Sequence, residues 1–196
     1  MTVNDEALMR AVRDGDLPKL GSLFDRHHRP LFDFLTRMTG NPHTAEDLVQ
    51  EVFLRILKYR ASYRDGASFE TWAFRIARNV RADYFSTRDP ASPLTEEAME
   101  SPDGAPGPEG QLEQELESVR LQTALMSLRE DRRELLVLAR YQGMKHEAIA
   151  ELLGIDVGAV KVRIHRALKE LREIFLRISE TPTCDVKISP RSLPSI

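Results

Sequence analysis

The stretch KHEAIAELLGIDVGAVKVRIHRALKELR, residues 145–172, predicts a helix-turn-helix. Ala150 is small enough for two helices to cross closely, and Gly154 stands where the chain has to turn with a positive φ angle. Asp156 precedes the second helix, and we expect its carboxylate to cap that helix by accepting hydrogen bonds from the first free N–H groups. Beyond the cap, apolar residues recur with helical period at Val160, Ile164, Ala167, Leu168 and Leu171.

The opposite side of this second helix is basic. Lys161, Val162, His165 and Arg166 form two i, i+4 pairs there. A helix with an apolar core face and a basic outer face is typical of one that lies in the major groove of DNA. An ordinary helical hairpin with a solvated charged face is the alternative. The turn, cap and basic face occur in the order that the motif needs, which favours DNA binding.

Composition indicates a soluble globular chain. Its 196 residues are 41% hydrophobic and 30% charged, enough for one large or two small domains. The longest apolar run, Leu135 to Ala139, is far too short to span a bilayer, and the N-terminus lacks a signal-peptide pattern, so we expect a cytoplasmic protein without membrane contact of its own. The single cysteine, Cys184, and the scattered histidines predict neither a disulfide framework nor a metal site, and no cofactor is expected.

Charge and composition divide the chain into segments. The segment DPASPLTEEAMESPDGAPGPEG, residues 89–110, is rich in Pro, Gly, Ser and acidic residues and predicts a flexible acidic linker. Apolar residues recur with helical period on both sides of it, and no strand is indicated. We therefore expect an all-α fold of two small helical domains, residues 1–88 and 112–180, joined by a linker over 89–111 and followed by a flexible tail over 181–196.

The periodicity predicts six helices ahead of the helix-turn-helix: 6–12, 17–39, 44–57, 68–88, 112–128 and 132–142. Thr44 is expected to begin the third of them, with Asp47 completing a capping-box-like pair. The polar side of this third helix carries Glu46, Asp47, Gln50 and Glu51. An acidic face beside apolar residues suits a basic groove of a protein better than DNA, with a solvated amphipathic helix as the alternative.

The helix expected over 68–88 interleaves aromatic residues with arginines. Its apolar stripe includes Phe69, Trp72 and Ile76, which leaves a second set wholly or partly outside: Phe74, Arg75, Arg78, Asn79, Arg81 and Phe85. Guanidinium groups that neutralise phosphates beside aromatic rings that stack bases are typical of surfaces binding single-stranded nucleic acid. The alternative, in which every aromatic residue is in the core and the arginines only solvate the helix, stays open on these residues alone.

Three blocks of the sequence, in this order along the chain, resemble the sigma-70 family. They are AEDLVQEVFLRIL at 45–57, FETWAFRIARNVRADY at 69–84 and HEAIAELLGIDVGAVKVRIHRALKELR at 146–172. The resemblance is to its extracytoplasmic-function (ECF, group IV) sigma factors and covers about residues 20–175. It implies a non-enzymatic subunit that binds core RNA polymerase, through the clamp helices of the largest subunit and the flap, and directs promoter-specific initiation. An anti-sigma factor is a further partner that the resemblance implies.

The family's functional positions fall on three sets of residues here. Contact with the polymerase clamp helices is implied for Asp47, Leu48, Gln50, Glu51 and Phe53. Recognition and melting of the minus-ten promoter element are implied for Arg75, Arg78, Asn79, Arg81 and Tyr84. Recognition of the minus-thirty-five element is implied for Lys161, Val162, Arg163, His165 and Arg166.

Two features depart from the family pattern. The recognition helix commonly opens with Gly-Thr-Val, whereas Gly158-Ala159-Val160 stands here and lacks the hydroxyl group. The segment TPTCDVKISPRSLPSI, residues 181–196, extends past the expected end of the family's second domain. A stand-alone helix-turn-helix repressor or response regulator is the alternative function, although it leaves the helices at 44–57 and 68–88 without a role. No Ser/His/Asp order, phosphate loop or metal cluster indicates an enzyme.

Overall fold

The computed structural model describes residues 3–87 and 108–180, so most of the predicted linker and the whole predicted tail lie outside the described residues. Every regular element within those two ranges is helical, which confirms the all-α prediction. The order is α1 (Asp5–Arg13), α2 (Lys19–Thr39), α3 (Pro42–Lys58), a 3₁₀ turn (Arg60–Ser62), α4 (Phe69–Thr87), α5 (Pro108–Ser127), α6 (Glu130–Leu136), a π-helical turn (Val137–Tyr141), α7 (His146–Leu153) and α8 (Val157–Glu180).

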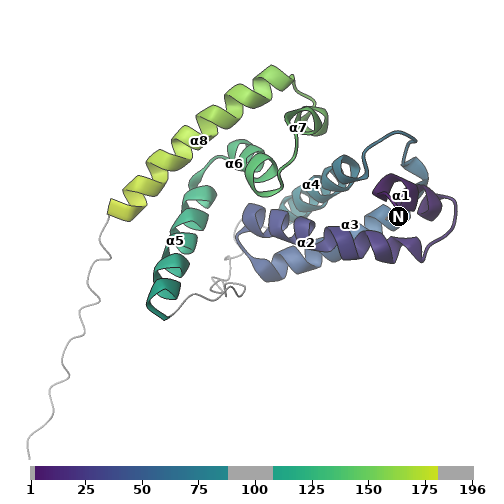
Figure 1. Ribbon diagram of the computed structural model, residues 1–196, viewed down its shortest axis with the longest axis horizontal. Coiled ribbons are helices and arrows are strands. Elements are labelled where there is room, and N and C mark those ends of the chain that lie inside the picture. The colour runs from purple at the N-terminus through teal and green to yellow at the C-terminus, as the bar shows by residue number, and fades with distance from the viewer. Residues whose placement is uncertain (1–2, 88–107, 181–196) are drawn as a thin grey trace, which may run out of the picture.

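Helices α1 to α4 form the N-terminal half of the molecule (Figure 1). Phe34 of α2 and Phe74 of α4 meet edge to face in its core, with ring centroids 5.3 Å apart. Asp5 joins α1 to α2 through Arg26 at 2.6 Å and His27 at 2.7 Å. Burial opposes ionisation of this carboxyl group, but the hydrogen bonds from Arg26 and His27 outweigh it and lower the pKa of Asp5. The acid on α1 therefore fixes the short first helix against α2.

The start of α3 differs from the prediction. The helix begins at Pro42, and Asn41 is its N-cap, with the side-chain oxygen accepting a hydrogen bond from the Thr44 N–H at 2.9 Å. The expectation that Thr44 begins the helix is therefore wrong. Proline at the first helical position loses no hydrogen bond, so Asn41-Pro42 makes a better start than Thr44.

The C-terminal half consists of α5 to α8. Helix α5 begins at Pro108 rather than at residue 112, and the helix expected over 132–142 is instead α6 followed by the π-helical turn. Gly154 ends α7 with a φ of 66°, in the left-handed region that favours glycine. The Asp156 carboxylate accepts hydrogen bonds from the N–H groups of Gly158 at 2.6 Å and Ala159 at 3.2 Å. The predicted turn and cap are both confirmed.

The two halves pack against each other, with α4 and α2 facing the second half (Figure 1). The Arg37 guanidinium of α2 stacks over the Tyr141 ring, 4.1 Å from its centroid. Met126 of α5 lies against Gly40, where a β-carbon would come within 3.3 Å of the methionine methyl group. Among the described helices, none is long and apolar enough to cross a membrane.

Candidate nucleic-acid and polymerase interfaces

The first turns of α8 present all five predicted minus-thirty-five residues to solvent. Val160, Ile164 and Ala167 are buried on the core face of the helix. The five residues on the remaining sides, Lys161, Val162, Arg163, His165 and Arg166, are exposed. Val162 is 50% exposed although it is apolar, so it is free to contact a thymine methyl group in a major groove. The structure brings this set together on one accessible, mainly basic surface.

The predicted minus-ten residues on α4 are divided between surface and interior. Arg75 and Asn79 are exposed, and Arg78 and Tyr84 are half-buried. Arg81 is only 7% exposed and Phe74 only 1%, so the expectation that these two lie wholly or partly outside is wrong. Phe74 belongs to the core of the first half, whereas Arg81 is covered by the second half of the molecule.

Each of the three arginines on α4 meets a carboxylate from the second half. Arg78 donates from Nε to Glu134 Oε1 at 2.7 Å and from Nη2 to Oε2 at 3.2 Å. Its Nη1 donates to the Leu152 carbonyl oxygen at 3.2 Å. Arg81 pairs with Glu130, and Arg75 approaches Glu151 at 3.7 Å. The sequence analysis missed these three acids; their only local signal is the i, i+4 spacing of Glu130 and Glu134 on α6.

The contact between α4 and α6 contains the guanidinium groups of Arg78 and Arg81 and also that of Arg133. Arg133 is 9% exposed. Burial lowers the pKa of Arg133, and the nearby Arg81 charge lowers it further. The hydrogen bond from Arg81 lowers the pKa of Glu130. The Nε atoms of Arg81 and Arg133 are both buried without a hydrogen-bond partner among the described residues. Three guanidinium groups thus share two carboxylates, of which that of Glu134 is buried and that of Glu130 is exposed.

On α3, the predicted polymerase-binding residues lie at different depths. Asp47 and Gln50 are exposed, and Glu51 is half-buried beside Arg55, which donates to it at 2.7 Å. Leu48 and Phe53 are in the core, 4% and 7% exposed. Leu54, at 61% exposed, was absent from the predicted set and is the apolar residue that α3 offers to solvent. Leu54 lies outside the apolar stripe of α3. An apolar residue on the polar side of a predicted helix was the feature of the sequence that could have indicated it.

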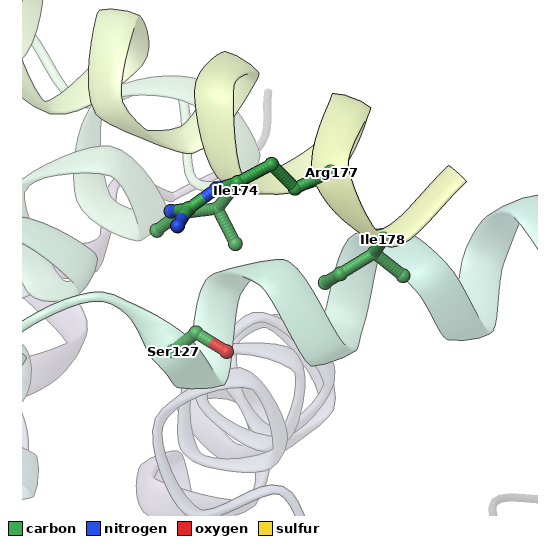
Figure 2. Close-up of a pocket in the computed structure, with 4 residues that line it drawn as sticks. All are labelled: Ser127, Ile174, Arg177 and Ile178. Carbon is green, nitrogen blue, oxygen red and sulfur yellow. The ribbon is translucent and has the colours of Figure 1, made fainter. Parts of the chain in front are cut away.

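A groove of about 380 Å³ runs between α5 and α8, lined by Ser127, Ile174, Arg177 and Ile178 (Figure 2). The figure shows the α8 side chains above the hydroxyl group of Ser127 on α5. This lining offers one hydroxyl and one guanidinium group, and no general base accompanies the serine. Within residues 3–87 and 108–180, no three His, Cys, Asp or Glu side chains gather in a group that could hold a metal ion.

The geometry is that of an all-α protein with a helix-turn-helix in one half and an arginine-bearing helix in the other, the architecture of a class of DNA-binding proteins. The family model of Sigma-70 region 2 matches residues 23–90, and that of Sigma-70 region 4 matches residues 118–171. The RNA polymerase sigma factor CarQ of Myxococcus xanthus is 35% identical over 85% of this chain and 95% of its own length. The ECF RNA polymerase sigma factor SigE of Mycolicibacterium smegmatis is 33% identical over 90% of this chain and 71% of its own.

Two solved structures share the fold. A complex of CnrH with the cytosolic domain of CnrY matches with a TM-score of 0.68 and 26% identity, over 90% of this chain and 99% of that one. The sigma factor RpoE of Bartonella quintana, in complex with the anti-sigma factor NepR, matches with a TM-score of 0.65 and 24% identity, over 80% of this chain and 96% of that one.

The chain belongs to the ECF sigma factors of the sigma-70 family. It carries both sigma regions, so it acts in transcription initiation with core RNA polymerase and promoter DNA as its partners. A stand-alone repressor is not favoured, because region 2 has no role in such a protein. Sigma factors are non-enzymatic regulators.

Proposed function

We propose that the exposed basic face of α8 reads the minus-thirty-five element. Lys161, Arg163, His165 and Arg166 supply donors for base edges and phosphates, and Val162 supplies an apolar contact. The observation that carries this assignment is the arrangement of these residues opposite a buried stripe, on a helix whose start is fixed by the Asp156 cap. Helix α4 captures the melted minus-ten strand through Arg75, Arg78, Asn79, Arg81 and Tyr84.

Helix α3 serves as the docking surface for the polymerase clamp. Asp47, Gln50 and Glu51 supply its acidic and polar contacts, and Leu54 supplies an apolar anchor. Leu48 and Phe53 support the helix from the core side. In this assignment residues 1–88 form region 2, residues 112–180 form region 4, residues 89–111 are an acidic linker, and residues 181–196 are a tail.

The protein works in the cytoplasm, without catalytic activity and under the control of a protein inhibitor. RpoE of Bartonella quintana shares its fold and binds the anti-sigma factor NepR. The charged faces of α3, α4 and α8 give such an inhibitor surfaces to occupy.

Run-off transcription tests the function. Core RNA polymerase is incubated with genomic promoter fragments, with and without the full chain, and the 5′ ends of the products are sequenced. New start sites that share two upstream elements support the proposal. Tight duplex binding by the chain alone, with no polymerase-dependent start site, would overturn it in favour of a repressor.

A further inference from the structure

An acid lies at one end of the exposed row of α4 to which we assign contact with the minus-ten strand. Arg75, Asn79 and Asp83 follow one another at i, i+4 spacing and are all exposed, so they form this row on one side of the helix. A carboxylate repels the phosphate groups of a strand that runs along the row. Asp83 by itself therefore opposes the binding that we assign to Arg75 and Asn79.

The Asp83 carboxylate is paired with an arginine from another helix. Arg55 of α3 donates from Nη1 to Asp83 Oδ2 at 2.6 Å and from Nε to Glu51 Oε1 at 2.7 Å. The hydrogen bond to Asp83, and after it the one to Glu51, raises the pKa of Arg55. The docking helix α3 thus places a permanent positive charge at the acidic end of the row.

We propose that Arg55 acts on strand capture through Asp83, whose negative charge it neutralises. With Arg55 in place, the row ends in an ion pair and admits a phosphate backbone. Without Arg55, the row ends in an uncompensated carboxylate that repels the strand. The inference rests on the proposed role of α4 and makes Arg55 a positioning residue of the minus-ten face.

Other contacts hold α3 and α4 together, so the ion pair is not needed to join the two helices. Val52 of α3 and Ala77 of α4 are fully buried in the shared core. The hydroxyl groups of Thr44 and Tyr84 lie 3.5 Å apart across the same two helices. Ion pairs with an exposed partner contribute little to stability. Loss of Arg55 should therefore change the charge of the row far more than the packing beneath it.

The test measures promoter opening by the holoenzyme, formed from core RNA polymerase and the full chain. The DNA consists of promoter fragments identified by run-off transcription, and permanganate reactivity of unpaired thymines reports the open complex. The chain is added at concentrations that saturate the polymerase. Saturation removes any effect that loss of the Arg55–Glu51 contact has on docking.

Two variants break the same ion pair but leave different charges on the row. R55Q exposes the Asp83 charge and should lower the equilibrium constant for opening about fivefold at low salt. R55Q/D83N also removes that charge and should restore opening to the wild-type level. R55K keeps a positive charge and should retain most of the opening. Because salt screens repulsion at an exposed group, the difference between R55Q and wild type should shrink between about 0.05 and about 0.3 M salt.

The ion pair of Arg132 on α6 with Glu170 on α8 provides the matched control. It also joins two helices, but neither of its charges lies on α3 or α4. R132Q loses the same charge as R55Q, and R132Q/E170Q removes the acid as well. These two variants should open promoters equally, because the acid that R132Q leaves behind is not on the row.

An R55Q/D83N variant that opens promoters as poorly as R55Q overturns the proposal, because the defect then comes from the broken ion pair or from a lost DNA contact. Normal opening by R55Q overturns it too. If R55Q does not fold, D83N decides: it leaves the Arg55 charge uncompensated and must raise opening above wild type. Failure of the underlying assignment looks different, since R75A then opens promoters normally.

Discussion

Arg78 of α4 and Glu134 of α6 form a two-point ion pair across the junction of the two sigma regions, at 2.7 and 3.2 Å. Glu134 is 7% exposed and the Arg78 side chain is 30% exposed, so the carboxylate is largely removed from water while the guanidinium group is half-buried. If Arg78 has the role proposed for α4, a DNA phosphate competes with this carboxylate for the same guanidinium group. The proposal therefore gives the two partners of this one contact different roles.

Alanine at Arg78 and glutamine at Glu134 should have opposite effects on initiation. R78A removes from α4 a group to which we assign phosphate binding, so run-off transcription with core polymerase should fall about tenfold. E134Q removes the competitor and leaves Arg78 in place, so transcription should equal or exceed wild type. Both variants break the same ion pair, and each therefore controls for the structural effect of breaking it in the other. Equal losses would assign the pair a purely structural role.

Local features of the fold were predictable from the sequence, because each depends on neighbouring residues. The Asp156 cap, the turn at Gly154 and the burial of Val160 follow from hydrogen bonding, backbone geometry and helical period within one short segment. The outward placement of Lys161 and Arg166 follows from the same period. Such features survive any arrangement of the two domains.

Features that depend on contacts between distant segments were not predictable. Arg81 is buried because α6 covers it, and its partner Glu130 lies 49 residues away in the sequence. Periodicity on α4 alone places Arg81 outside, since it carries no information about a second domain. The prediction of where α3 begins was wrong for a local reason. Asn41 and Thr44 are both good caps, and only Pro42 decides between them.

Lys161→Ala tests the assignment of α8 to the minus-thirty-five element. Loss of one phosphate contact should reduce the salt dependence of promoter binding by the holoenzyme, with the slope of log K against log salt falling by about 1. The weakening should be similar for all promoters that the holoenzyme uses. Arg120→Ala on α5 removes the same charge elsewhere and should leave the slope unchanged. A slope that is unaltered in K161A would place this residue outside the interface.

Leu54→Asp tests the docking surface on α3. Its side chain is 61% exposed, so the charge is tolerated by the fold but opposes burial against the polymerase. We expect affinity for core RNA polymerase to fall about tenfold, measured by competition with a labelled wild-type chain. Leu17→Asp, at a 43% exposed position just before α2, is the matched control and should bind normally. Identical affinities for the two variants would exclude Leu54 as an anchor.

Asp156→Ala tests the cap that fixes the start of α8. Two N–H groups lose their acceptor, so the free energy of unfolding should fall by about 1 kcal/mol. D156N keeps a side-chain oxygen in place and should recover most of the loss. Urea denaturation followed by circular dichroism at the helix band measures both. An unfolding midpoint in D156A equal to that of wild type would show that the cap contributes nothing to stability.

Tyr63 should make the protein sensitive to alkaline pH. Burial raises the pKa of its hydroxyl group from 10.0 to about 12. Below pH 10 the hydroxyl is neutral in both the folded and the unfolded chain, so its contribution to stability is fully present. As pH rises from 10 towards 12, the unfolded chain ionises first and stability falls.

Phenylalanine at position 63 removes the ionisable group but keeps the ring that packs edge to face against Trp72, 5.2 Å between centroids. Y63F should therefore start less stable than wild type, since the hydrogen bond from the hydroxyl to the Ala67 carbonyl oxygen is lost. It should then lose less stability between pH 10 and 12. Tyr59, at 48% exposed, provides the control: Y59F should follow the wild-type pH profile. Parallel profiles for Y63F and wild type would mean that another group carries the alkaline transition.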